Sequence, residues 1–437
     1  MNSTKLFGTD GVRGVAGTEL TAELALSLGR AAASEADAER PHVLIVRDTR
    51  ESGPMLEAAL AAGIAEGGGD ALLAGVLPTP AASVLVRRLG LDLGAVVSAS
   101  HNPWQHNGIK YFGPDGRKLS DELEGRIEAH VAESGAPSPA VGRVRTLEGA
   151  MDDYLRELTS KFQLDLSGRR IALDCANGAT YRAAPLVFER LGAAVEVLSD
   201  QPDGRNINEG CGSTHPEPLA VAVRDGDAEI GFAFDGDGDR VIAVDSSGAV
   251  RDGDELIALG ATHLARNGAL GGGVVVTVMS NFGFHEAMRE AGIDAATTPV
   301  GDRHVAAQLT ERGWSLGGEQ SGHIIWSEYG PTGDGIAAAL LVMSALGDAR
   351  LEDAIPMRKL PQVLRNVEIA DRGAIDSAAA VWGAVEAESA KLEGRGRILV
   401  RPSGTEPLIR VMVEAPTEEE SEEVCARLVE VITRELK

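Results

Sequence analysis

The chain repeats short apolar runs, each of which ends in a polar loop and is followed by a stretch with helical spacing. Such runs lie at 42–46, 71–77, 93–97, 171–173, 194–198, 230–234 and 274–278; helical spacing lies at 21–33, 55–66, 81–89, 151–162, 284–291 and 335–346. Strands alternating with helices predict α/β units built on mostly parallel sheets. Open sheets of this kind bind ligands at the carboxyl ends of their strands, so the loops after these runs are where chemistry is expected.

Composition limits the classes of function that need to be considered. The 437 residues are 43% hydrophobic and 24% charged, which is typical of a soluble globular protein of several domains. A net charge of -25 argues against nucleic acid and anionic membranes as partners. The three cysteines, Cys175, Cys211 and Cys425, form no C-x-x-C pair, and the N-terminus lacks the apolar core of a signal peptide. We therefore expect a cytoplasmic protein.

One polar loop places a serine in a cationic setting. The run at 93–97 leads into Ser98-Ala99-Ser100-His101-Asn102-Pro103 and then Asn107-Gly108-Ile109-Lys110. Ser100 beside His101 and Lys110 suits a hydroxyl that accepts or carries a phosphoryl group. The alternative is that Ser98 and Ser100 only cap the next helix, because serine is common in caps and turns.

A second loop carries three aspartates at alternate positions. Asp235-Gly236-Asp237-Gly238-Asp239-Arg240 follows the apolar run 230–234. Carboxylates on a glycine-flexed loop can converge on one hard cation, and Mg²⁺ would complete its shell with phosphate oxygens and water. An EF-hand does not fit, because its sixth position would be Arg240 and its twelfth Ser246. A solvated acidic turn is the remaining alternative.

Two further loops offer groups for a sugar phosphate. Gly318-Glu319-Gln320-Ser321-Gly322-His323 can hold sugar hydroxyls or an amine, with a hairpin turn as the alternative. Arg401-Pro402-Ser403-Gly404-Thr405-Glu406-Pro407-Leu408-Ile409-Arg410 combines two arginines, two hydroxyls and glycine-exposed amides. Donors of these kinds favour a phosphate-binding loop.

These motifs, together with Leu6-Phe7-Gly8-Thr9-Asp10-Gly11-Val12-Arg13-Gly14, resemble those of the α-D-phosphohexomutases and occur in that family's order. The N-terminal motif taken alone reads as a β-turn. The resemblance implies that Ser100 is the phosphoserine and the fourth ligand of one Mg²⁺ per chain, after Asp235, Asp237 and Asp239. It implies catalytic or substrate roles for Arg13, His101, Lys110, Arg240, Glu319, Ser321 and His323. It assigns Arg401, Ser403, Gly404, Thr405 and Arg410 to the phosphate that is not transferred.

The resemblance also implies a fold and a reaction. We expect an α/β fold of four domains around a central cleft: three related units with mixed sheets at 1–150, 151–251 and 252–360, and a smaller α+β domain at 361–437. The C-terminal domain is expected to move so that the cleft closes on its substrate. Ser100 would exchange its phosphoryl group with a sugar phosphate through a 1,6-bisphosphate, which acts as intermediate and activator. Lys110, His101 and Arg13 remain alternatives for the group that moves the proton.

Within the superfamily the chain is similar to bacterial phosphoglucosamine mutases, which feed UDP-N-acetylglucosamine and peptidoglycan precursor synthesis. Gln320 is typical of that group, whereas methionine at this position is usual in the alternative, the phosphomannomutases and phosphoglucomutases. His106 departs from the usual aspartate before Asn107 and Gly108. A catalytically silent sugar-phosphate sensor is the remote alternative. A homodimer is expected from the resemblance alone, which leaves open whether a kinase or autophosphorylation first modifies Ser100.

Overall fold

The residues that the structure describes form two compact units that together contain four sheets. The computed structural model describes residues 6–8, 10–132, 140–369, 374–375, 378–403 and 407–436. The first unit comprises residues 1–279 and 293–355 and holds three sheets; the second comprises 280–292 and 356–437 and holds the fourth. The expected α/β architecture of three mixed sheets and a small C-terminal domain is confirmed.

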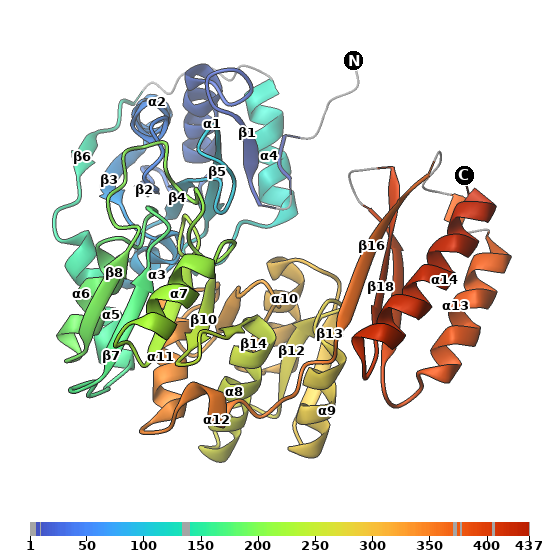
Figure 1. Ribbon diagram of the computed structural model, residues 1–437. Helices are drawn as coiled ribbons and strands as arrows, with labels where there is room; N and C mark the ends of the chain where they lie inside the picture. The colour runs from blue at the N-terminus through green and yellow to red at the C-terminus, as the bar shows by residue number, and fades with distance from the viewer. Residues whose placement is uncertain are drawn as a thin grey trace. The chain divides into compact units, whose positions relative to one another are not determined.

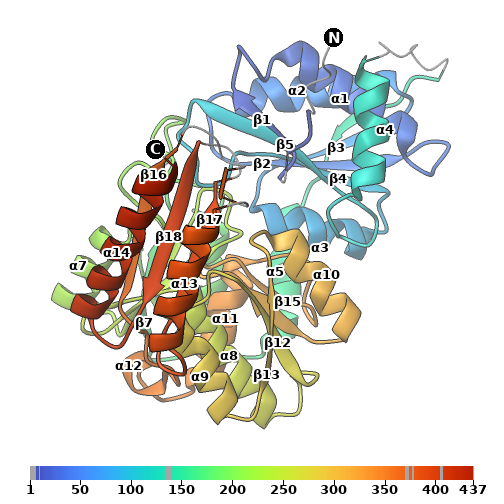
Figure 2. The same ribbon diagram turned by 90° about the vertical axis from the view of Figure 1, so that its right-hand side faces the viewer.

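The first sheet is mixed and has helices on both faces. Its strand order is β1-β5-β4-β2-β3-β6, in which β2, β3, β4 and β6 are parallel and β5 is antiparallel to both β4 and β1. Helices α1, α2 and α4 lie on one face and α3 on the other (Figure 2). The elements are β1 (Val12–Val15), α1 (Ala22–Glu35), β2 (His42–Arg47), α2 (Gly53–Glu66), β3 (Asp70–Val76), α3 (Thr79–Leu89), β4 (Leu93–Val97), β5 (His106–Phe112), α4 (Asp121–Ala132) and β6 (Val144–Thr146).

The second sheet has the order β11-β10-β9-β7-β8, with parallel strands β8, β7 and β9 and an antiparallel edge formed by β10 and β11. Strand β9 is buried at every residue, as expected for a central strand covered on both faces. The elements are α5 (Ala150–Lys161), β7 (Arg170–Asp174), α6 (Ala183–Arg190), β8 (Ala194–Leu198), α7 (Glu217–Asp225), β9 (Ile230–Phe234), β10 (Val241–Asp245) and β11 (Val250–Arg251).

The third sheet, in the order β13-β12-β14-β15, completes the first unit. Helix α8 begins with a capping box, in which Asp252 accepts from the amide of Glu255 and the Glu255 carboxylate accepts from the amide of Asp252. The elements are α8 (Gly253–Arg266), β12 (Gly273–Thr277), β13 (Asp294–Thr298), α10 (Asp302–Arg312), β14 (Leu316–Gly318), β15 (Ile324–Trp326), α11 (Gly335–Leu346) and α12 (Leu351–Ala354).

The second unit has its own sheet and core. Helices α13 and α14 pack on the antiparallel sheet β16-β18-β17 (Figures 1 and 2). Its core includes Ile409, Val411, Val413, Cys425 and Leu428. The elements are α9 (Phe282–Glu290), β16 (Gln362–Glu368), α13 (Ala379–Lys391), β17 (Arg397–Pro402), β18 (Leu408–Glu414) and α14 (Glu418–Leu436).

Two strands of the first sheet, β1 and β5, are not revealed by the pattern of their sequences. Residues 12–15, where a turn was the alternative interpretation, form β1, because they pair with β5 from Val12 opposite Ile109 to Val15 opposite His106. Strand β5 itself contains His106, Asn107 and Lys110. Among the described residues no helix is both long and apolar enough to cross a bilayer.

Candidate active site

Ser100 lies in the loop between β4 and β5, at the carboxyl end of a fully buried strand. Its backbone is left-handed, with φ of 52°, which is uncommon for a residue other than glycine. The residue is 2% exposed, and its Oγ donates a hydrogen bond to Asp235 Oδ2 at 2.5 Å. His101 Nδ1 lies 3.3 Å from the same Oγ. The loop therefore presents the serine hydroxyl directly to the aspartate loop of the second sheet.

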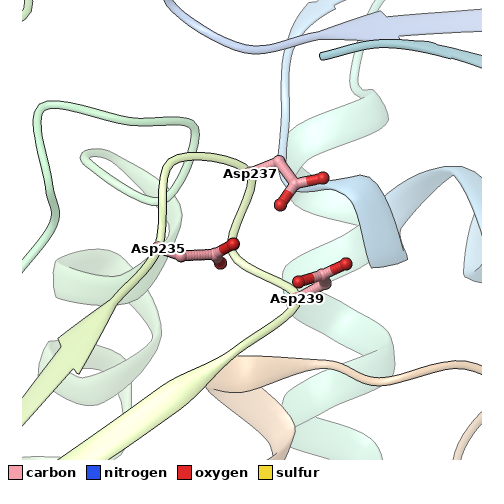
Figure 3. Close-up of side chains that lie close together, drawn as sticks. All are labelled: Asp235, Asp237 and Asp239. Atoms are coloured by element: carbon pink, nitrogen blue, oxygen red, sulfur yellow. The ribbon is translucent and has the colours of Figure 1, made fainter. Parts of the chain in front are cut away.

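The three aspartates follow β9 and gather on one loop, as Figure 3 shows. All three are buried, and one carboxylate oxygen from each lies within 4.8 Å of the others. Asp237 Oδ1 and Asp239 Oδ1 are buried without a hydrogen-bond partner. Burial and the charges of Asp239 and Asp237 raise the pKa of Asp235 well above its ordinary value. Oxygen ligands, unsatisfied lone pairs and crowded negative charge fit a hard divalent cation.

Lysine and arginine side chains counter this negative charge. Lys110 Nζ lies 2.8 Å from Asp237 Oδ2 and 3.8 Å from Asp239 Oδ2. Burial opposes its charged form, but Asp10, Asp237 and Asp239 outweigh burial and raise the pKa of Lys110. Burial also opposes the charged form of Arg240, but Asp239, Asp235, Glu319 and Asp237 raise its pKa. Both side chains are therefore cations fixed beside the aspartates.

Lys110 belongs to a closed ring of ion pairs in which acidic and basic side chains alternate. The ring connects residues from the parts of the chain that contain the first, second and third sheets. Asp10 bridges Lys110 (3.8 Å) and Lys118 (2.5 Å), and Lys118 reaches Asp302 at 2.6 Å. His323 lies 3.7 Å from Asp302 and 3.6 Å from Asp239, which returns to Lys110. Burial opposes protonation of His323, but the acidic groups around it raise its pKa. The ring fixes the walls of the site in all three domains.

A cavity of about 270 Å³ opens among these groups. Its lining residues are Asp10, Arg13, His101, Lys118, Asp239, Arg240, Val300, Gly301, Asp302, Glu319 and His323. The pKa of His101 is lowered by burial and by the charges of Arg240 and Arg13. Glu319 Oε2 accepts from the amide of Gly301 at 3.3 Å. Ser321, in contrast, is exposed and is not part of this lining. The cavity offers both cations and carboxylates to a ligand.

The second unit carries the described residues of the predicted phosphate loop on two paired strands. Arg401 on β17 and Arg410 on β18 are directly opposite each other in the antiparallel register. Burial and the charge of Arg410 lower the pKa of Arg401. Ser403 is buried and its amide donates to the carbonyl of Leu408. Gly404 and Thr405 lie outside the described residues. Two facing guanidinium groups repel each other, and an anion between them would relieve the repulsion.

Comparison with known proteins decides the family. Models of phosphoglucomutase/phosphomannomutase domains I, II, III and the C-terminal domain match residues 4–137, 152–248, 252–359 and 364–431. The chain belongs to this family. Its members are phosphohexomutases, enzymes of the isomerase class that move a phosphoryl group within a sugar.

Similar proteins cover almost the whole chain of this phosphohexomutase. Phosphoglucosamine mutases of Desulforudis audaxviator and Pelotomaculum thermopropionicum are 52% and 50% identical, with 98% of each chain covered in both comparisons. The structure of a phosphoglucomutase/phosphomannomutase family protein from Burkholderia thailandensis aligns with a TM-score of 0.83 at 26% identity, covering 99% and 98% of the two chains. Aspergillus fumigatus N-acetylphosphoglucosamine mutase, solved with GlcNAc-6P and magnesium, aligns with a TM-score of 0.70 at 18% identity, covering 99% and 96%.

The phosphohexomutase site contains residues to which the motifs gave no role. Asp10 lies inside the N-terminal motif, so its position near Arg13 was a usable signal, whereas Asp302 lies in none of the motifs described above. Lys118 lies beyond strand β5 and has no motif around it. Arg50 and Asn208 donate hydrogen bonds to backbone carbonyls of the Ser100 loop. The sequence does not predict such contacts, because every residue has a backbone carbonyl.

Proposed function

We propose that this phosphohexomutase interconverts glucosamine 6-phosphate and glucosamine 1-phosphate, with Ser100 as the residue that carries the phosphoryl group. The observation that supports the proposal most strongly is the 2.5 Å hydrogen bond between Ser100 Oγ and Asp235 in a buried cluster of three aspartates. A serine in such a place serves phosphoryl transfer, which requires positioning and charge neutralisation more than covalent chemistry from the protein.

The reaction consists of two transfers at one serine. In the first, the C1 hydroxyl of glucosamine 6-phosphate attacks the phosphorus of phosphoserine Ser100; the bond from phosphorus to Oγ breaks and a bond to O1 forms, while the C1 hydroxyl loses its proton and the freed Oγ gains one. The glucosamine 1,6-bisphosphate then turns within the site. Ser100 Oγ next attacks the 6-phosphate and loses its own proton, while O6 gains one, which releases glucosamine 1-phosphate. The free bisphosphate would therefore also act as an activator of unphosphorylated enzyme.

A single Mg²⁺ is the cation that we propose for the triad, because Asp235, Asp237 and Asp239 supply only oxygen ligands. Bound there, it would supply positive charge beside the oxygens of the transferred group. Lys110 and Arg240 add cations that the surrounding acids hold in the charged form. The protein thus counters charge from several directions around Ser100.

Geometry favours His101 as the group that moves the proton. Its Nδ1 lies 3.3 Å from Ser100 Oγ, within reach of a tightening hydrogen bond. Lys110 is engaged with Asp237, and Arg13 with Asp10. Those two cations are better suited to orient phosphate oxygens than to accept a proton. We propose that Arg401, Ser403, Gly404, Thr405 and Arg410 bind the phosphate that is not being transferred.

The preference for an amino sugar rests on two supports. Relatives named phosphoglucosamine mutase share about half of their residues with this chain over nearly its full length. The cavity also contains the carboxylates of Asp302 and Glu319, which can accept hydrogen bonds from the C2 ammonium group of glucosamine phosphate. A neutral hexose phosphate has no ammonium group to pair with these carboxylates. We expect this difference to make the enzyme prefer glucosamine phosphate over glucose or mannose phosphates.

Parallel assays of kcat/KM test the proposal. The enzyme is supplied with Mg²⁺, a trace of the matching 1,6-bisphosphate, and glucosamine 6-phosphate, glucose 1-phosphate or mannose 1-phosphate. Glucosamine 6-phosphate should give the highest ratio, and Asp302→Asn should lower that ratio more than the ratios for the neutral hexoses. Ser100→Ala should abolish turnover of all three. A neutral hexose that wins overturns the glucosamine assignment; an active Ser100→Ala variant overturns the phosphoserine mechanism.

A further inference from the structure

The left-handed backbone conformation of Ser100 must be stabilised by contacts with surrounding residues. A residue other than glycine at φ of 52° costs about 1 kcal/mol or more relative to the ordinary regions. Such a conformation persists only where the surroundings determine it. Two side chains outside the established motifs, Arg50 and Asn208, supply those surroundings.

Arg50 binds the Ser100 loop from the first domain. The side chain is completely buried, which is rare for arginine. Its Nη2 donates to the carbonyls of Ser100 (2.8 Å) and Asn102 (2.9 Å), and its Nη1 donates to that of Pro103 (2.5 Å). One planar guanidinium group therefore fixes three carbonyls of a single loop.

Asp48 extends this contact to the amide of Ser100. Its Oδ2 accepts from Arg50 Nε at 2.8 Å and from Ser98 Oγ at 2.5 Å. Ser98 Oγ in turn accepts from the Ser100 amide at 3.0 Å. Both backbone polar groups of Ser100 are thus fixed through one Arg50–Asp48 pair. Because Asp48 neutralises Arg50 at close range, the arginine acts here by orientation and contributes little net charge.

Asn208 reaches the same carbonyls from the second domain. Its Nδ2 lies 3.0 Å from the Ser100 carbonyl and 3.2 Å from that of Asn102. Gly236, between the first two aspartates of the triad, packs against the same place: a Cβ there would lie 2.6 Å from the Ser100 carbonyl and 2.7 Å from Asn208 Nδ2. The Ser100 carbonyl is therefore a point of contact between the Ser100 loop and the loop that carries the three aspartates.

We propose that Arg50 and Asn208 are positioning residues that hold the Ser100 carbonyl from two domains and thereby set the separation of Ser100 Oγ from the aspartate triad. Neither side chain is part of the cavity lining, so neither is expected to bind the sugar. Their contribution belongs to the transfer step, where a displacement of about 1 Å can cost about a hundredfold in rate. The inference rests on the proposed role of Ser100.

Asn208→Ala, Asn208→Asp and Arg50→Lys test the proposal in the full-length enzyme with Mg²⁺. The readouts are kcat and KM for glucosamine 6-phosphate and the single-turnover rate of transfer from ³²P-labelled phosphoenzyme, normalised to phosphoserine content. We expect the transfer rate of Asn208→Ala and Arg50→Lys to fall tenfold or more, with KM within about twofold of wild type. Asn208→Asp should be slower still, because it turns an acceptor toward two carbonyls.

The matched control is Arg47→Lys, since Arg47 pairs with Glu57 and donates to its neighbour's carbonyl but does not contact the Ser100 loop. It should transfer at close to the wild-type rate. Unchanged transfer by folded Asn208→Ala, or a loss confined to KM, would overturn the inference. Wild-type enzyme that carries no ³²P on Ser100 would instead overturn the proposed function, so the two failures are distinguishable.

Discussion

At the scale of single residues, the site depends on buried charged groups, each of which is stabilised by oppositely charged neighbours. Lys110 is 3% exposed and lies among Asp10, Asp237 and Asp239. A buried lysine normally loses its proton to reduce the cost of burial, whereas here the acids keep it charged. The Lys110 ammonium group therefore neutralises part of the negative charge of Asp237 and Asp239, the charge that we expect to attract a metal ion.

Lys110→Met should separate the catalytic role of this charge from metal binding. We expect kcat to fall by about a hundredfold or more, because a fixed cation beside the transferred group is lost. Mg²⁺ affinity, measured by calorimetric titration, should rise, because the triad loses a competing charge. Lys118→Met is the control: Lys118 pairs with Asp10 and Asp302 and should change Mg²⁺ affinity less. Weaker Mg²⁺ binding by Lys110→Met would contradict this account.

A buried acid away from the cavity gives a pH dependence whose sign is defined. Burial raises the pKa of Asp334 from 3.8 to about 6, although hydrogen bonds from Ala337 and Tyr154 lower it. The native state therefore binds this proton more tightly than the unfolded state. Its stabilising contribution is complete below pH 3.8 and is lost as pH rises through about 6, a change of about 3 kcal/mol.

Asp334→Asn removes this titration and should keep the cap of α11, because asparagine is an equally good N-cap. The unfolding midpoint of wild type relative to Asp334→Asn should therefore fall as pH rises from 4 to 7 on thermal melts, in the direction given by the raised pKa of Asp334. Asp348→Asn, on the exposed surface, is the control and should follow the wild-type profile. Parallel profiles for wild type and Asp334→Asn would contradict the assignment.

At the scale of elements, the site is built from loops that leave the carboxyl ends of buried strands. Strands β4 and β9 lie in different sheets, and both are buried at every position. Their loops meet at the contact between Gly236 and the Ser100 carbonyl. The rigid strands thus fix where each loop begins, and the close backbone approach fixes how the loops meet.

Gly236→Ala should disrupt this meeting point. Its Cβ would lie 2.6 Å from the Ser100 carbonyl, so one of the two loops must shift. We expect a loss of kcat of at least tenfold and a smaller rise in unfolding midpoint on addition of Mg²⁺. Gly125→Ala in α4, where a Cβ meets nothing within 4 Å, is the control and should keep full activity. Wild-type kcat in Gly236→Ala would show that the approach is not needed.

At the scale of the whole molecule, the sequence predicted the α/β architecture and singled out the loops of Ser100 and of the three aspartates, which the structure brings together. It could do so because apolar runs that end in polar motifs leave a local signal. It did not reveal β1 and β5, whose polar residues are paired only through tertiary contacts. It also gave no role to Asp302 or Asn208, because the importance of each depends on a partner far away in the chain: Lys118 for Asp302 and the Ser100 carbonyl for Asn208. The local sequence pattern identifies a motif, whereas the residues that contact the motif from distant parts of the chain are seen only in the folded structure.

The division into two compact units, each with its own core, leads to a prediction about unfolding. A ligand stabilises the part of a protein that binds it. Calorimetry of the full chain should therefore show that Mg²⁺ raises the transition of the unit that contains Asp235 and Asp237, while EDTA reverses the shift and the transition of the other unit stays in place. The double variant Asp235→Asn, Asp237→Asn should show no shift. If Mg²⁺ moved both transitions equally in wild type, the units would unfold as one cooperative body; if the double variant still responded, the triad would not be the metal site.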